Sequence, residues 1–140
     1  MGLRKRILVV DDEERVLFVL SEGLAMLGKE YEIVTAGGGR EALDKITQAA
    51  FDLVITDLRM PDMDGLQLTE AIKALNPVTI VVWITAYDCY KLRGEAERLG
   101  VYRCLDKPLE IKEIRETVRE ALGEGRRKAA AGSGQLSSKD

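Results

Sequence analysis

Three short runs of apolar, mostly β-branched residues constrain the fold of this chain more than any other feature. They span residues 6–10, 53–55 and 78–84. These runs lack the strict alternation of apolar and polar residues that a strand with one wet face shows. They are therefore typical of strands buried on both faces, as in a parallel sheet. Two weaker runs, residues 31–36 and 102–105, predict two further strands.

Between these runs, apolar residues recur at the helical spacing of three and four, and each such stripe can cover one side of a sheet. The stripes comprise Leu17, Leu20, Leu24 and Leu27; Leu43 and Ile46; Leu68, Ile72 and Leu75; Leu92, Ala96 and Leu99; and Ile111, Ile114, Val118 and Leu122. Gly28, Gly100, Gly123 and the pair Asn76-Pro77 stand where these helices are predicted to end. Five strands alternating with five helices predict a three-layer α/β fold with a doubly wound, five-stranded parallel sheet.

The length of 140 residues favours one domain, and the composition changes near its end. Residues 123–140 contain four glycines, three serines and a single large apolar residue, Leu136. Such a segment cannot bury enough apolar surface to order itself. We therefore interpret residues 1–122 as the folded domain and residues 123–140 as a flexible tail or a truncated linker.

Composition excludes several functional classes. The net charge of −3 argues against a nucleic-acid-binding module. No apolar run approaches the roughly 18 residues that span a bilayer, and the apolar stretch near the N-terminus is too short for a signal peptide. Two cysteines are too few for a disulfide framework, which with the missing export signal predicts a reducing, cytoplasmic location. The absence of histidine excludes histidine triads and most zinc or haem sites.

Polar residues follow four of the predicted strands. Asp11 and Asp12 end the first, Asp57 the third, Thr85 the fourth, and Lys107 follows the fifth. In open α/β sheets ligands bind outside the carboxyl ends of the strands, so these side chains should share one cleft. Two carboxylates 4 Å apart repel by about 4 kcal/mol at an effective dielectric constant near 20. Such a cluster requires a cation, and oxygen ligands with open water positions favour Mg²⁺.

Each residue also has an ordinary structural interpretation. Asp12 and Glu13 could cap the first helix, and Asp57 could begin a turn. Lys107 could be a solvated surface lysine. The coincidence of these residues at the ends of different strands favours the functional interpretation.

Four segments together carry a family resemblance: ILVVDDE at 7–13, FDLVITDLRMPDMDG at 51–65, ITA at 84–86 and LDKPLE at 105–110. Through them, residues 5–122 resemble the receiver domain of the two-component response regulators. The resemblance implies a flavodoxin-like strand order of 2-1-3-4-5.

The resemblance also implies a magnesium site. Asp57 matches the aspartate that accepts a phosphoryl group and also contacts the metal. Asp12 matches a direct Mg²⁺ ligand, and Asp11 matches a ligand that acts largely through water. The backbone carbonyl of Arg59 matches a further ligand.

The remaining implied roles concern the phosphoryl group. Thr85 matches the hydroxyl that hydrogen-bonds the group, Lys107 matches the lysine that pairs with it, and the Lys107-Pro108 bond is expected to be cis. Because the chain lacks histidine, the phosphohistidine donor must be another molecule, a sensor histidine kinase or a histidine phosphotransfer protein. The chain would then catalyse only its own Mg²⁺-dependent phosphorylation and dephosphorylation. It would act as a switch on a downstream output domain or protein, with homodimerisation on activation as a further possibility.

One position departs from the family pattern. Cys104 occupies the place of the family's switch aromatic residue, which puts the usual coupling to Thr85 in doubt. One hypothesis is that Trp83, which shares the strand parity of Thr85, fills that face instead. The alternative, which we favour, is that Trp83 and Cys104 are simply part of the core. Cys89 is interpreted as an inert helix residue, and a redox-sensing role of Cys104 is disfavoured because no basic residue beyond Arg103 adjoins it.

Three rival functions remain to be distinguished. A flavodoxin-like FMN-binding protein needs a loop rich in Ser, Thr and Gly after the first strand, where this chain has four acidic residues that would repel a phosphate. A metal-dependent hydrolase would turn over external phosphomonoesters. A receiver-like module that only binds partners would not need the full set of site residues.

Overall fold

The five strands form one parallel sheet. The computed structural model describes residues 4–124. Its strands are β1 (Lys5–Val10), β2 (Tyr31–Ala36), β3 (Leu53–Asp57), β4 (Ile80–Thr85) and β5 (Arg103–Asp106), and they lie in the order β2-β1-β3-β4-β5. This order and the parallel pairing confirm the flavodoxin-like arrangement expected from the sequence.

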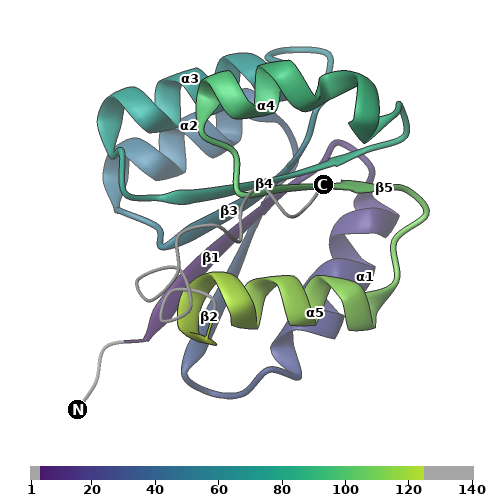
Figure 1. The fold of residues 1–140 in the computed structure, drawn as a ribbon. Coiled ribbons are helices and arrows are strands. Elements are labelled where there is room, and N and C mark those ends of the chain that lie inside the picture. The colour runs from purple at the N-terminus through teal and green to yellow at the C-terminus, as the bar shows by residue number, and fades with distance from the viewer. Residues whose placement is uncertain (1–3, 125–140) are drawn as a thin grey trace.

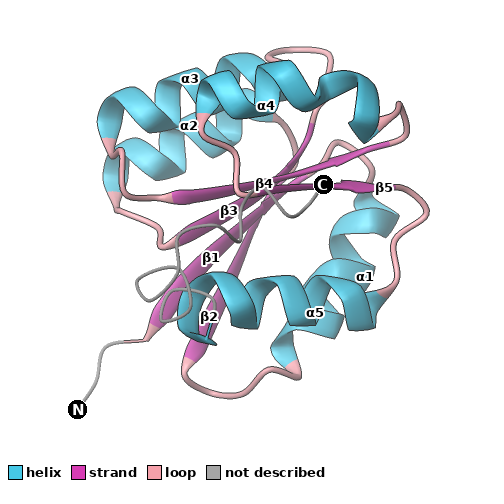
Figure 2. Cartoon of the chain, viewed as in Figure 1, coloured by secondary structure: helices cyan, strands magenta, loops and turns pink. Residues whose placement is uncertain are grey.

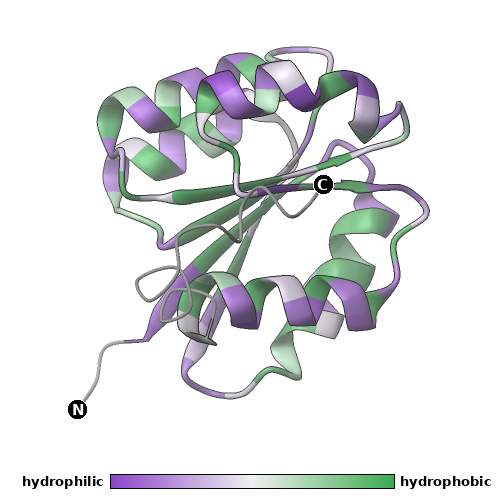
Figure 3. Cartoon of the chain, viewed as in Figure 1, coloured by the Kyte–Doolittle hydropathy of each residue, from purple (hydrophilic) through white to green (hydrophobic). Residues whose placement is uncertain are grey.

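Helices cover both faces of the sheet (Figures 1 and 2). Helices α1 (Glu14–Ala25) and α5 (Ile111–Arg119) lie on one face. Helices α2 (Gly39–Gln48), α3 (Gly65–Leu75) and α4 (Arg93–Leu99) lie on the other. Figure 3 shows the strands as predominantly hydrophobic, whereas the helices carry stripes of both kinds. The three-layer prediction is thereby confirmed.

Two apolar cores explain why the central strands lack alternation. In β1, Ile7 and Val9 point into the core beneath α1 and α5, whereas Leu8 and Val10 point into the core beneath α2 and α3. All four side chains are fully buried. Because helices cover both faces, each position along the strand must be apolar.

Some boundaries differ from the sequence predictions. Strand β4 begins at Ile80 rather than at residue 78, because Thr79 N–H donates to the Asn76 carbonyl in a turn that leaves Val78 exposed. Gly100 is the C-cap residue of α4 and has a positive φ of 72°, as suits a residue that ends a helix. Helix α1 ends earlier than predicted, at Ala25 with Met26 as its C-cap, and Gly28, whose φ is 127°, lies beyond that end. Gly123 does not end the last helix, because a π-helical turn, Glu120–Glu124, continues it. The predicted tail spans residues 123–140. Only its first two residues, 123 and 124, are among the described residues.

The two cysteines are paired, which corrects the interpretation of Cys89 as inert. Cys89 begins a 3₁₀ turn, η1 (Cys89–Leu92), that precedes α4. It forms a disulfide with Cys104 on β5. The Cα atoms lie 5.7 Å apart, although the two residues are 15 positions apart in the sequence. Proximity here comes from the return of the chain through α4, which no local pattern around either cysteine reveals.

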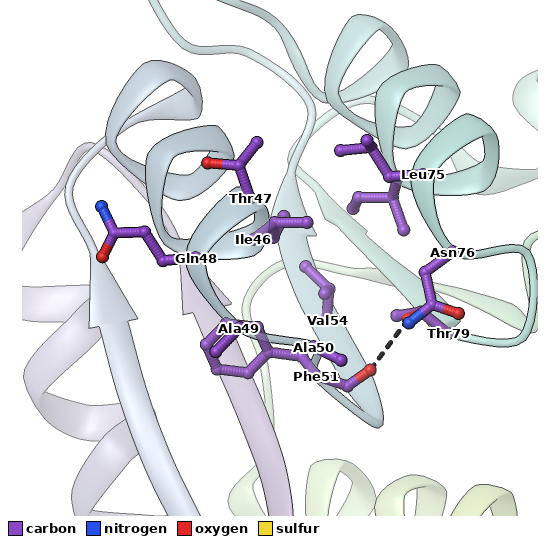
Figure 4. A pocket seen from close by; sticks show the side chains of 11 residues that line it. Ile46, Thr47, Gln48, Ala49, Ala50, Phe51, Val54, Leu75, Asn76 and Thr79 are labelled. Carbon is purple, nitrogen blue, oxygen red and sulfur yellow. Dashed lines mark hydrogen bonds between the residues drawn. The ribbon is translucent and has the colours of Figure 1, made fainter.

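A pocket opens at the amino-terminal edge of the sheet, opposite the ends of the strands that carry Asp57 and Thr85 (Figure 4). It lies between the ends of α2 and α3, where Thr79 Oγ1 donates to the Phe51 carbonyl over 2.8 Å. Its lining residues include none of the predicted site residues. Among residues 4–124, no helix is long and apolar enough to cross a membrane.

Candidate functional site

The carboxyl ends of the central strands bring three aspartates together. Strands β1 and β3 are neighbours, and their pairing ends with Val10 opposite Thr56. Asp11 and Asp57 each follow one of these residues, so they leave the sheet side by side. Carboxylate oxygens of Asp11, Asp12 and Asp57 all lie within 4.8 Å of one another. The structure thus groups the three acids that the sequence placed at one edge.

Lys107 supplies the cation of this cluster. Its Nζ lies 3.1 Å from Asp11 Oδ2 and 3.2 Å from Asp57 Oδ2. The lysine follows β5 at the sheet edge, and its N–H donates to the Thr85 carbonyl, which fixes the start of the loop. The Lys107-Pro108 peptide bond is cis, as expected.

Burial shifts the pKa values of the charged groups in this cluster. Asp11 is fully buried, and burial raises the pKa of its carboxyl against the lowering effects of the Glu13 N–H and of Lys107. Burial by itself would lower the pKa of Lys107, but its hydrogen bonds and attraction to Asp11 and Asp57 outweigh that effect and raise it. Three carboxylates face a single ammonium group, so negative charge is in excess. A hard divalent cation fits this set of oxygen ligands.

Backbone donors hold the Asp57 carboxylate from the other side. Its Oδ1 accepts hydrogen bonds from the N–H groups of Leu58, at 2.7 Å, and Arg59, at 3.4 Å. Gly65 N–H donates to the Leu58 carbonyl and closes the loop. A Cβ atom at Gly65 would collide with the Asp57 carbonyl oxygen and would lie 2.8 Å from Leu58 Cα. The loop therefore packs against α3 with no space for a side chain at this glycine.

The first helix begins beside the aspartates without a side-chain cap. Glu13 is the N-cap residue of α1, but its side chain makes no capping hydrogen bond. Instead, the Glu13 N–H donates to Asp11 Oδ1 over 2.9 Å. Asp12 is exposed, so its carboxylate faces the cleft mouth rather than the core.

Thr85 ends β4 in the position that the sequence predicted. It is fully buried, and the residue before it, Ile84, pairs with Asp57 across the sheet. Its Oγ1 accepts the Tyr87 N–H at 2.9 Å. A hydroxyl that accepts one hydrogen bond can still donate its own proton, so Thr85 can donate to an anion bound near Asp57.

An exposed cation–π pair lies beside the site. The guanidinium of Arg59 lies 4.1 Å from the centroid of the Tyr87 ring, which joins the loop after β3 to the loop after β4. Tyr87 keeps 59% of its surface exposed. The backbone of Arg59 lies beside Asp57, since its N–H donates to that carboxylate over 3.4 Å.

Trp83 lies on the same sheet face as Cys104, in agreement with its strand parity. The indole is fully buried in the core beneath α2, α3 and α4, and Cys104 packs against that core. Its Nε1 donates to Thr69 Oγ1 over 2.9 Å, and Thr69 in turn donates to the Gly65 carbonyl. These bonds fix the ring as a core residue, which confirms the favoured interpretation for Trp83. For Cys104 that interpretation was incomplete, because this residue also forms the disulfide with Cys89.

Comparison with known proteins agrees with this geometry. Residues 7–119 match the family model of the response regulator receiver domain. The transcriptional regulatory protein ZraR of Escherichia coli K12 is 39% identical over 116 residues, which are 83% of this chain and 26% of ZraR. The chain thus spans about a quarter of the length of that relative. Sporulation initiation phosphotransferase F of Bacillus subtilis 168 is 33% identical over 121 residues, 86% of this chain and 95% of that protein.

Solved structures show the same likeness. A CheY-like receiver domain protein from Methanospirillum hungatei JF-1 superposes with a TM-score of 0.81 at 30% identity, covering 89% of this chain and 98% of the other. The response regulator TrrA of Thermotoga maritima, in complex with Mg²⁺-BeF, superposes with a TM-score of 0.75 at 36% identity, covering 84% and 99%. The family match, the strand order and the acidic cluster at the carboxyl ends of the strands lead to one conclusion: this chain belongs to the family of response regulator receiver domains of two-component systems.

Proposed function

We propose that Asp57 accepts a phosphoryl group and that the charge pattern around it makes this transfer possible. The observation that carries the proposal is the sharing of Lys107 Nζ between Asp11 Oδ2 and Asp57 Oδ2. The Lys107 ammonium group lies beside the Asp57 carboxylate, which would be the nucleophile. Asp11 and Asp12 lie next to that carboxylate. This is what a site needs if it neutralises both a carboxylate and an incoming phosphoryl group.

The transfer itself requires positioning more than covalent chemistry by the protein. A carboxylate oxygen of Asp57 attacks phosphorus in line, the new O–P bond forms, and the P–N bond of the donor phosphohistidine breaks as imidazole leaves. Charge spreads over the equatorial oxygens in the transition state. Lys107, which directly follows β5, and the hydroxyl of Thr85 at the end of β4 would stabilise that charge. Water later cleaves the acyl phosphate, returning Asp57 and inorganic phosphate.

A magnesium ion would complete the site. Asp11, Asp12 and Asp57 would hold it, together with the backbone carbonyl of Arg59. Bound there, the ion would supply neutralisation of the phosphoryl oxygens. The support for this ligand set is the grouping of the three carboxylates within 4.8 Å.

The proposal extends to partners. The donor would be a phosphohistidine of a sensor kinase or phosphotransfer protein, because these 140 residues contain no histidine of their own. Phosphorylation would then alter the surface presented to an output domain or protein. We retain residues 1–122 as the functional unit, a cytoplasmic location, and homodimerisation on activation as parts of the proposal. The protein would not turn over external substrates as a conventional enzyme does.

Intact mass spectrometry tests the phosphoacceptor. Wild type, Asp57→Asn and the control Asp44→Asn, which alters an exposed aspartate on α2, are incubated with a small acyl phosphate and Mg²⁺. We expect one phosphoryl adduct on wild type and Asp44→Asn, and none on Asp57→Asn or when EDTA replaces Mg²⁺. An adduct on Asp57→Asn would contradict the assignment. Repeated release of phosphate from a phosphomonoester would favour a hydrolase instead.

A further inference from the structure

The disulfide joins the two segments that carry Thr85 and Lys107, the residues proposed to stabilise a phosphoryl group on Asp57. Cys89 follows Thr85 by four residues, and Cys104 precedes Lys107 by three. The bond therefore links the loop after β4, through η1, to the strand that delivers the lysine. This disulfide therefore lies close to the site along the chain on both of its sides.

Hydrogen bonds tie the same two segments. Cys89 N–H donates to Asp106 Oδ1 over 3.0 Å, and Lys107 N–H donates to the Thr85 carbonyl over 2.8 Å. The pairing of β4 with β5 ends at Thr85 opposite Asp106. With the disulfide closed, residues 85–89 are thus held on β5 at both ends. With it open, the Cys89 end rests on a single hydrogen bond in an exposed setting.

The disulfide is within reach of small reagents. Both cysteines are partly exposed, and η1 contains no buried residue. Tyr90, beside Cys89, is 70% exposed. Solvent-accessible disulfides are the ones that thiols reduce and re-form, whereas enclosed ones serve as structural bonds.

We propose that Cys89 and Cys104 form a reversible redox modification site that controls how freely residues 86–92 move, and thereby how fast Asp57 is phosphorylated. The effect on rate rests on the proposed function; the cross-link and its reversibility do not. A dithiol reductant delivers two electrons and two protons, the S–S bond breaks, two cysteine thiols form, and the reductant becomes a disulfide. A low-molecular-weight disulfide such as oxidised glutathione reverses the exchange. One cysteine thiolate attacks it and releases one glutathione thiol, and the other cysteine thiolate then attacks the mixed disulfide and releases the second.

The direction of the effect follows from the restraint. A phosphoryl group on Asp57 must be accommodated beside Thr85, whose hydroxyl now accepts the Tyr87 N–H. Any adjustment of Thr85 and Tyr87 must be absorbed before Cys89, because the closed disulfide holds that residue on β5. The oxidised protein should therefore form the adduct several-fold more slowly than the reduced protein.

The first part of the experiment tests the site without reference to phosphorylation. The chain is equilibrated with oxidised glutathione or with dithiothreitol, blocked with iodoacetamide, and weighed intact. Hydrogen exchange is followed in residues 86–92. We expect no alkylation after oxidation, two alkylations after reduction, and faster exchange in the reduced form. Failure to form the disulfide under oxidised glutathione, or equal exchange in both forms, would overturn the proposal.

The second part measures the rate of adduct formation with a small acyl phosphate and Mg²⁺. Wild type is compared in both redox states with Cys89→Ser, which should match reduced wild type under either condition. Cys104→Ser provides a second variant should the first fail to fold. Equal rates in oxidised and reduced wild type would refute the regulatory role. If neither form gains an adduct, the proposed function fails, while the exchange data still decide whether the cross-link restrains the segment.

Discussion

Removing the ammonium group of Lys107 should expose the electrostatic cost of the aspartate cluster. The Lys107→Met substitution keeps a long apolar side chain and deletes the charge. It leaves Asp11, which is fully buried, and Asp57, which is 6% exposed, without their shared cation. The variant should therefore lose stability in the absence of metal, and added Mg²⁺ should compensate for part of the loss.

The magnitude follows from the two short contacts. At 3.1 Å and an effective dielectric constant of 20, each ion pair has a Coulomb energy of about 5 kcal/mol, part of which offsets the desolvation of the ammonium. Breaking a buried pair by removing one partner costs about 3–5 kcal/mol. Lys107 retains 19% side-chain exposure, so we expect the lower end, about 3 kcal/mol at neutral pH.

Metal and pH should both modulate that loss. Mg²⁺ should bind the more negative cluster of the variant more tightly, and each tenfold gain in affinity returns about 1.4 kcal/mol. Burial raises the pKa of Asp11, so this carboxyl takes up a proton in the folded chain at a higher pH than in the unfolded chain. Below that raised pKa the Asp11 carboxyl is neutral, so loss of the Lys107 ammonium no longer leaves a buried charge at Asp11 without its partner. The deficit of the variant should therefore shrink as the pH falls toward the usual carboxyl range.

Urea unfolding followed by tryptophan fluorescence provides the assay, because Trp83 is the single tryptophan and is fully buried. Wild type and Lys107→Met are compared with Lys112→Met, which removes an exposed lysine on α5. Each is measured with EDTA and with excess Mg²⁺. A loss no greater than that of Lys112→Met, or a loss unchanged by Mg²⁺, would refute the reasoning.

Three further predictions concern the scaffold of the site. Trp83→Phe removes the buried hydrogen bond to Thr69 and part of the ring, and should lower the unfolding free energy by about 2 kcal/mol. Urea unfolding followed by circular dichroism measures this change, and an unchanged free energy would show that the indole hydrogen bond does not stabilise the fold. Gly65→Ala forces a Cβ against the backbone of Asp57 and Leu58 and should lower the unfolding free energy by about 3 kcal/mol. Gly94→Ala, with open space around it on α4, should leave that energy unchanged or raise it by up to about 1 kcal/mol, and equal effects of the two substitutions in thermal melts would contradict the packing argument. Reduction of the Cys89–Cys104 disulfide, whose partners are 15 residues apart, should lower the unfolding free energy by about 3 kcal/mol, a change that Cys89→Ser should reproduce without reductant.

Patterns with a direct physical cause were predictable from the sequence. The unbroken apolar run of β1 indicated burial on both faces, and Ile7, Leu8, Val9 and Val10 are all fully buried. The site residues were predicted from their positions at strand ends. The strand order and the role of each site residue came from motifs that resemble a family, since the acids alone also fitted a helix cap. Boundaries were less predictable: Val78 has strand propensity, yet the turn from Asn76 to Thr79 leaves it exposed.

Local sequence was enough to predict the alternation of strands and helices, because apolar periodicity is a property that each element must satisfy to bury its own face. It also determined which acids, hydroxyl and lysine stand at strand ends. Three long-range contacts could be seen only in the folded chain: Lys107 bridges Asp11 and Asp57, Trp83 donates to Thr69, and Cys89 is bonded to Cys104. Each of these contacts joins residues far apart in the chain. Their distances depend on how the helices between the strands return the backbone to the sheet, which no local window of sequence specifies.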